Sequence, residues 1–159
     1  MIRIGIGYDL HRLVHGRPLI LGGVNIPFDR GLEGYSDADA LAHAVTDALL
    51  GAAALGNIGQ HFPDTDPRYR EVDSFFLLHR VLEMLRDRGW RIANLDANIV
   101  AQEPKLNPYL DAMRERLAQC LQMPMDTVSV KVKTNEGVGA EGRGEAISTQ
   151  VAVLITNDA

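Results

Sequence analysis

Two periods of hydrophobic and polar residues alternate along this chain. Apolar residues at every second position are typical of strands, and this spacing occurs in residues 2–8, 19–27, 90–102, 128–132 and 146–156. The range 19–27 contains Gly22-Gly23, which predicts two short strands joined by a turn. Apolar residues at every third or fourth position predict helices, and they lie over about residues 36–56, 74–88 and 107–122.

The helix and strand boundaries are marked by turn-forming residues. Ser36 and Asp39 have the spacing of a capping box, so we expect the first helix to begin at Ser36. The segments between the periodic stretches are rich in Gly, Pro and Asp and are expected to be loops, at residues 31–35, 57–67 and 137–144.

The mixed order of strands and helices predicts an α/β (α+β) fold, in which a single sheet is covered by helices on one face. Residues 1–159 contain no linker-like run or change of composition, so we expect one domain. A sheet that is covered on one face must bury the other, and this favours assembly into an oligomer.

Composition narrows the possible partners. The formal net charge of −5 excludes a broad basic surface for nucleic acid. No apolar run reaches the roughly 20 residues that span a membrane, and the single Cys120 allows no intrachain disulfide. The N-terminus shows a strand pattern and no signal peptide. We therefore expect a soluble, cytoplasmic protein.

A candidate metal site is the clearest chemical feature of the sequence. Asp9 and His11 are two residues apart on a predicted strand, so their side chains point to the same face. His43 lies on the first predicted helix among small residues that permit close packing. Two imidazoles and one carboxylate can hold a divalent cation and leave positions open for a substrate. Asp47, one helical turn after His43, is either a hydrogen-bond acceptor for that imidazole or a solvated carboxylate.

Three other segments carry polar groups with two interpretations each. Lys131–Glu136 precedes a glycine-rich stretch containing Arg143, and this pattern suits an anion, although an ordinary hairpin explains the glycines equally well. Phe62–Pro67 offers Asp64 and Asp66 to a ligand, or forms a rigid turn. Ala101–Asn107 either grips a base or phosphate or is a polar connection between a strand and a helix.

The motifs taken together resemble the 2-C-methyl-D-erythritol 2,4-cyclodiphosphate synthases of the non-mevalonate isoprenoid pathway. The resemblance extends over nearly the whole chain, and the order of the motifs is more specific than any one of them. The matching segments are Gly7–Arg12, Gly22–Pro27, Ser36–His43, Thr46–Gly56, Phe62–Pro67, Ala101–Leu106, Lys133–Glu136 and Gly142–Glu145.

The resemblance implies a homotrimer with active sites between neighbouring subunits. It implies that Asp9, His11 and His43 bind Zn²⁺ or a similar divalent ion, and that Glu136 helps to bind a second ion, Mg²⁺ or Mn²⁺, which bridges the diphosphate. Thr134 and Tyr35 are the implied catalytic residues. The implied substrate-binding residues are Asp9, His11, Tyr35, Ser36, Asn57, Ile58, Gly59, Phe62, Asp64, Asp66, Ala101, Gln102, Pro104, Lys105, Leu106, Lys133, Thr134, Asn135, Glu136, Ala140 and Arg143.

The implied reaction is an intramolecular phosphoryl transfer. The 2-phosphate of 4-diphosphocytidyl-2-C-methyl-D-erythritol 2-phosphate attacks the β-phosphorus, and CMP leaves. Such a reaction requires positioning and charge neutralisation more than a covalent nucleophile. This chain has Tyr35 where the family usually has His, Asn57 where Asp is usual and Ala140 where an aromatic residue is common.

Two other functions are compatible with the same residues. A two-histidine, one-carboxylate group also occurs in Fe(II) oxygenases, although their sheet-rich scaffold differs from the predicted fold. A trimeric protein that binds metal and nucleotide with weak or lost turnover is the third possibility, because Tyr35 and Asn57 replace residues of the family pattern.

Overall fold

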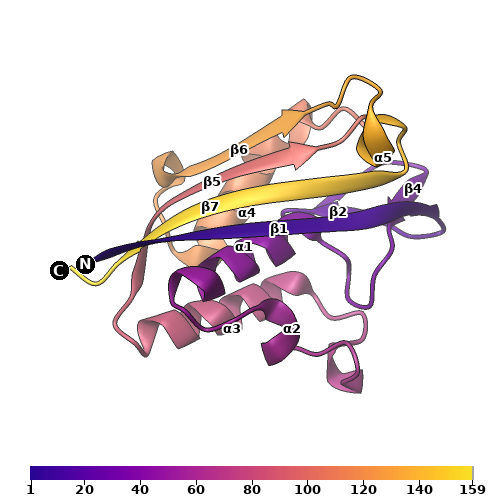
Figure 1. Ribbon diagram of the computed structural model, residues 1–159. Helices are drawn as coiled ribbons and strands as arrows, with labels where there is room; N and C mark the ends of the chain where they lie inside the picture. Colours follow the sequence, from indigo (N-terminus) through magenta and orange to yellow (C-terminus); the bar gives the residue numbers. More distant parts are fainter. Residues whose placement is uncertain (159) are drawn as a thin grey trace.

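The structure, a computed structural model, describes residues 1–158 and contains one large sheet with its helices on one side (Figure 1). The sheet has the strand order β4-β1-β7-β5-β6. Its strands are β1 (Ile2–His15), β4 (Arg30–Leu32), β5 (Arg91–Val100), β6 (Val128–Lys133) and β7 (Ala146–Thr156). Neighbouring strands are antiparallel except β5 and β6, which run parallel. The short strands β2 (Leu19–Leu21) and β3 (Val24–Ile26) form a separate hairpin.

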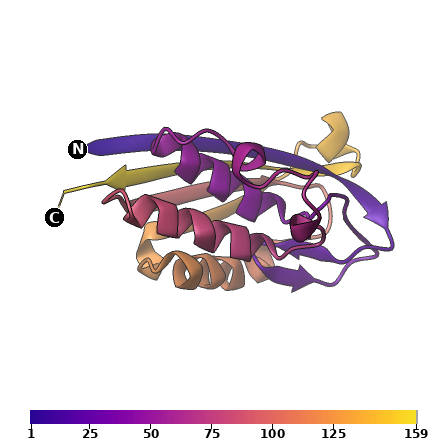
Figure 2. The same cartoon turned by 90° about the horizontal axis from the view of Figure 1, so that it is seen from below.

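Three long helices lie on one face of the sheet, as Figure 2 shows from below. They are α1 (Ala40–Ala52), α3 (Ser74–Arg86) and α4 (Leu110–Leu121). α1 packs on β1 and β7, α4 packs on β6, and α3 lies against both helices. The predicted α/β class and the covered single face are therefore confirmed. No helix within residues 1–158 is long and apolar enough to cross a membrane.

The opposite face of β1 is open and apolar. Every second side chain of this strand points away from the helices, and these side chains are 42–78% exposed; they are Ile2, Ile4, Ile6, Tyr8 and Leu10. The alternating residues Gly5 and Gly7 face α1 instead. A Cβ atom at Gly7 would lie 1.8 Å from the Ala44 carbonyl oxygen, so only glycine allows the helix to pack this closely. This close packing brings α1 to within side-chain reach of β1.

Several predicted boundaries were wrong. The first strand continues past Tyr8 to His15, and part of the expected loop 31–35 belongs to β4. α1 begins after Asp39, whose side chain accepts the Ala42 N–H, so Asp39 and not Ser36 is the N-cap. The helix ends at Ala52 because Ala54 adopts a left-handed conformation, with φ of 58°.

Two predicted loops contain short helices. α2 (Ile58–His61) begins at a capping box made by Asn57 and Gln60. α5 (Gly139–Gly142) forms within the glycine-rich segment. The short 3₁₀ helices are Pro67–Tyr69, Asn107–Tyr109 and Met125–Thr127.

Asp39 is completely buried and ties the hairpin to α1. Its carboxylate accepts N–H bonds from Gly22 at 2.9 Å and from Gly23 at 2.8 Å, in addition to the helix N-cap bond. Burial, offset in part by these hydrogen bonds and strengthened by the charge of Asp37, raises the pKa of Asp39 to about 6. The folded protein therefore binds a proton at Asp39 more tightly than the unfolded chain does.

We expect this burial to make stability depend on pH. Because the folded pKa lies above the unfolded value of 3.8, the stability that Asp39 contributes is complete below that value and is lost as the pH rises through about 6. The free energy of unfolding, relative to that of an Asp39→Asn variant, should fall by roughly 3 kcal/mol between about pH 3.5 and pH 7. Urea unfolding of both proteins across this range measures the difference. A difference that does not change with pH would contradict the prediction.

Candidate metal and substrate site

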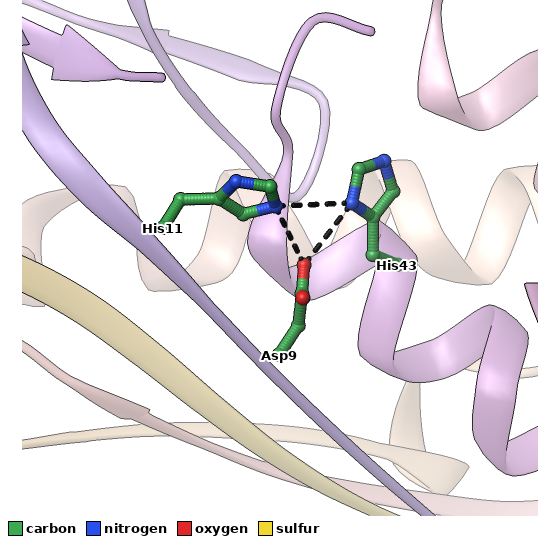
Figure 3. Close-up of side chains that lie close together, drawn as sticks. All are labelled: Asp9, His11 and His43. Atoms are coloured by element: carbon green, nitrogen blue, oxygen red, sulfur yellow. Dashed lines mark hydrogen bonds and ion pairs between the residues drawn. The ribbon is translucent and has the colours of Figure 1, made fainter. Parts of the chain in front are cut away.

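Asp9, His11 and His43 converge on one point (Figure 3). Asp9 Oδ2 lies 2.8 Å from His11 Nε2 and 3.0 Å from His43 Nδ1, and the two nitrogens are 3.3 Å apart. One ligand atom of each residue lies within 4.8 Å of the others, and all three side chains are partly buried. The predicted grouping of these residues is confirmed.

Local structure places each member of the group. Asp9 and His11 lie on β1, which pairs with β7 at Thr149 and Ile147. His43 lies in the first turns of α1, and its N–H bonds to the Asp39 carbonyl. The close packing of α1 on the glycine side of β1 brings the imidazole of His43 to the two strand residues.

The imidazole of His11 is held by the backbone. Its Nδ1 lies 2.7 Å from the carbonyl oxygen of Glu33, which can only accept a hydrogen bond, so Nδ1 carries a proton and Nε2 is the nitrogen that faces the group. Arg17 fixes the same loop, because its guanidinium donates to the carbonyls of Gly34 at 3.0 Å and Ser36 at 2.8 Å.

The electrostatics of the group favour an ionised carboxylate. Burial raises the pKa of Asp9, but hydrogen bonds and charge from His11 and His43 outweigh burial and lower its pKa below the ordinary value. Burial lowers the pKa of His11, and the hydrogen bond and charge of Asp9 outweigh burial and raise it. Without a bound cation, the group is thus stabilised by proton sharing with an anionic Asp9.

The donor set fits a divalent metal. Carboxylate oxygen and imidazole nitrogen are the ligands that zinc accepts, and three protein ligands with an open position are typical of catalytic zinc sites. Both imidazoles also use their remaining nitrogen in a hydrogen bond, His11 to Glu33 and His43 to Ser74 and Ser36. Such outer contacts commonly orient metal-binding histidines.

A cavity of about 430 Å³ lies beside the metal group, and several of the predicted substrate-binding residues line it. His11 and His43 of the metal group line it. The predicted substrate-binding residues that line it are His11, Tyr35, Ser36, Ile58, Gly59, Phe62 and Asp64. The structure therefore brings together the metal group, the loop before α1 and the segment from α2 to Pro67.

Tyr35 and Asp66 are held by contacts within the protein. The Tyr35 hydroxyl donates to the Asp66 carbonyl oxygen at 3.0 Å, which links the loop before α1 to the loop after α2. The Asp66 carboxylate accepts from the guanidinium of Arg68 and from its N–H. Of the two carboxylates in this loop, only Asp64 lines the cavity.

Asn57 and Asp47 together hold α2. The Asn57 side chain caps the helix by accepting the Gln60 N–H at 3.1 Å. Asp47 Oδ1 accepts the Ile58 N–H at 2.7 Å, and burial raises the pKa of Asp47. The sequence predicted that Asp47 either contacts His43 or is solvated. Its hydrogen bond to α2 corresponds to neither prediction.

Most of the remaining predicted residues lie at the ends of β5 and β6. These strands are parallel, with Val100 beside Lys133, and the Ala101 N–H bonds to the Lys133 carbonyl at 2.9 Å. The segments that follow them are therefore neighbours, as their carboxyl ends share one edge of the sheet. They contain Ala101, Gln102, Pro104, Lys105, Leu106, Lys133, Thr134, Asn135 and Glu136.

These nine residues form a second group, and none of them lines the cavity next to the metal group. Ala101 and Leu106 are buried. Lys133, Thr134, Asn135 and Glu136 are all exposed. Thr134 Oγ1 accepts the Glu136 N–H at 3.3 Å, and Glu136 has a left-handed conformation with φ of 52°. Ala140 lies on α5, and exposed Arg143 donates to Glu145.

Sequence reasoning missed several residues around the metal group, namely Arg17, Glu33, Asp37 and Ser74. Their partners are between 17 and 37 positions away in sequence, so no local spacing indicates the contacts. One weak signal in the sequence pointed to Ser74: it directly follows Asp73, the N-cap of α3, and so lies at the start of a helix.

The chain matches known proteins over almost its entire length. The model of the YgbB family matches residues 2–156. The 2-C-methyl-D-erythritol 2,4-cyclodiphosphate synthase of Moorella thermoacetica is 59% identical over 154 residues, covering 97% of this chain and 94% of that protein.

Solved structures show the same fold. The bifunctional IspDF of Campylobacter jejuni superposes with a TM-score of 0.94 at 39% identity, covering 98% of this chain and 42% of that one. The CDP-bound form of a 2C-methyl-D-erythritol-2,4-cyclodiphosphate synthase superposes with a TM-score of 0.90 at 39% identity, covering 97% of this chain and all of that one.

Proposed function

This chain belongs to the YgbB family, whose curated relatives are 2-C-methyl-D-erythritol 2,4-cyclodiphosphate synthases, and we propose how its residues carry out that reaction. The activity is that of a lyase of isoprenoid biosynthesis, which converts 4-diphosphocytidyl-2-C-methyl-D-erythritol 2-phosphate to the 2,4-cyclodiphosphate and CMP. The observation that carries the assignment of the site is the convergence of Asp9, His11 and His43 beside a cavity.

In our proposal, the metal group and the second group divide the substrate between them. Asp9, His11 and His43 would hold one divalent ion, and Glu136 would help to hold a second. When bound, these ions would supply positive charge to neutralise the phosphates. The cavity lined by Ser36, Phe62 and Asp64 takes the methylerythritol part, since its apolar walls and single carboxylate suit a small polyol.

The second group takes the cytidine diphosphate part. The Ala101–Leu106 and Lys133–Glu136 segments offer backbone groups, amide side chains and two lysines next to one another. Thr134 has an exposed hydroxyl at the start of this loop and orients the phosphates. Arg143, the C-cap of α5, adds a planar cation that is paired with Glu145 before substrate binds, and Ala140 lies on the same short helix.

These residues act by alignment and charge neutralisation. The 2-phosphate oxygen forms a bond to the β-phosphorus while the bond from the β-phosphorus to the oxygen of CMP breaks, and CMP leaves with that electron pair. The attacking phosphate is already an anion, so no protein base has to remove a proton. Holding the two phosphates in line is the main task of the site.

We also propose a homotrimer with the site between subunits. Within one chain, no residue of the second group lines the cavity beside the metal group, so in our proposal a neighbouring chain supplies the missing half of each site. The exposed apolar row on β1 gives a surface that a second and a third copy would cover. We propose a single domain in a cytoplasmic protein, and the single cysteine suits a reducing cytoplasm. The net charge of −5 offers no support for a nucleic-acid partner, and we propose none there or in a membrane.

An assay for CMP release tests the function directly. Incubation with the diphosphocytidyl substrate should give CMP and the cyclodiphosphate in equal amounts, and a chelator should stop the reaction until divalent metal is restored. Binding of metal and CDP without CMP release would favour the protein with lost turnover. Oxygen consumption with Fe(II) would favour an oxygenase, an alternative that the family membership does not support.

Tyr35 gives a prediction specific to this chain. Because its hydroxyl holds the Asp66 carbonyl, Tyr35→Phe should loosen the loop that carries Asp64. One neutral hydrogen bond of this kind is worth about 1 kcal/mol, so we expect KM to rise by about fivefold while kcat stays nearly unchanged. Steady-state kinetics of CMP release measure both constants. A large fall in kcat with constant KM would instead place the hydroxyl on the reacting phosphates.

Tyr35→His, which restores the usual family residue, should preserve or raise activity.

A further inference from the structure

The second nitrogen of His43 contacts two serine hydroxyls, and this contact differs from that of His11. His43 Nε2 lies 2.8 Å from Ser74 Oγ and 3.0 Å from Ser36 Oγ. A hydroxyl both donates and accepts, unlike the Glu33 carbonyl that holds His11. Serine alone therefore does not determine whether Nε2 carries a proton.

The carboxylate of Asp37 removes this ambiguity. Its Oδ1 accepts the Ser74 hydroxyl proton in a short hydrogen bond, and its Oδ2 accepts the Ser74 N–H at 3.0 Å. The Asp39 N–H also donates to Asp37, at 3.1 Å, and fixes the carboxylate. Since the hydroxyl proton of Ser74 points to Asp37, only lone pairs of Ser74 Oγ face the imidazole of His43.

We propose that Asp37 and Ser74 are positioning residues that hold His43 with its Nε2–H donated to Ser74 and its Nδ1 free for a divalent cation. Asp37 lies before α1, Ser74 is the fully buried first residue of α3, and His43 lies on α1. The chain from carboxylate to hydroxyl to imidazole thus ties the orientation of one metal ligand to the packing of two helices. The proposal rests on the metal-binding part of the proposed function and not on its chemical step.

Zinc affinity and the imidazole proton test the proposal without an activity assay. Competition with a chromophoric chelator should show that Ser74→Ala and Asp37→Asn each weaken Zn²⁺ binding by about 10- to 100-fold, the range typical of residues that orient metal ligands. In the Zn²⁺-loaded parent protein, NMR should show a His43 Nε2–H that exchanges slowly with water, and this protection should be lost in Ser74→Ala.

Asp73→Ala is the matched control. Asp73 caps α3 by accepting the Phe75 N–H at 2.9 Å, so its loss weakens the same helix end without touching His43. This variant should melt at a lower temperature and bind Zn²⁺ as the parent does. If Ser74→Ala fails to fold, Asp37→Asn decides, because it keeps the size of the side chain.

Two results would overturn the proposal. One is Zn²⁺ affinity within twofold of the parent in a folded Ser74→Ala or Asp37→Asn variant. The other is rapid exchange of the His43 Nε2–H in the Zn²⁺-loaded parent. A protein that fails to release CMP but shows the expected affinities would contradict the proposed function and leave the role of Asp37 and Ser74 in place.

Discussion

Replacement of His43 by alanine should remove bound Zn²⁺ and nearly all CMP release while the fold is kept. The imidazole supplies one of three ligand atoms that lie within 4.8 Å of one another, and an Asp–His pair alone is a poor zinc site. Loss of one major source of electrostatic stabilisation typically lowers kcat on the order of 10²–10³-fold. Metal content after dialysis and the rate of CMP release measure the two effects in the same preparation.

His79→Ala provides the control for this variant. His79 also lies on a helix, but it is half exposed on α3, and its only ion-pair partner within residues 1–158 is Glu83, at 3.8 Å. We expect its metal content and activity to equal those of the parent. Near-normal turnover in a folded His43→Ala protein would refute the assignment of the metal ligands.

The sequence predicted the chemistry of the metal group because strand geometry is local. Side chains two residues apart on a strand share a face, so their spacing alone is enough to pair Asp9 with His11. The prediction that His43 joins this pair rested on the small residues around it. In the structure, one of them, Ala44, packs against Gly7 of β1 through its carbonyl. Sequence periodicity also predicted β7 to the residue, since the apolar side chains of Ile147, Val151, Val153 and Ile155 are all buried on it.

Capping and long-range contacts explain most of what the sequence did not predict. Ser36 and Asp39 both suit an N-cap, and Asp39 is used because it also binds the hairpin at Gly22 and Gly23. Asp47 binds α2 instead of His43, a contact that depends on how the chain returns after Gly56. Contacts of this kind arise from tertiary packing, and the local sequence preferences of the chain do not predict them.

The separation of the metal group from the second group could be recognised only in three dimensions. In sequence, the Ala101–Leu106 and Lys133–Glu136 segments are simply two distant stretches that follow strands. The parallel pairing of β5 and β6 places both segments at one edge of the sheet, away from the cavity beside His43. This arrangement supports our proposal that a second chain completes the site.

Mixing two inactive variants should therefore restore activity. His43→Ala destroys the metal half of a site, and Glu136→Ala destroys the half that holds the second ion. If each site combines the metal half of one subunit with the second half of its neighbour, random assembly from equal amounts of the two chains gives about a quarter of the sites two intact halves. We expect CMP release near a quarter of the parent rate after the variants are unfolded and refolded together. Each variant refolded alone should stay inactive, and so should a simple mixture of preformed trimers. No recovery in co-refolded samples of the correct mass would show that both halves of a site come from the same chain.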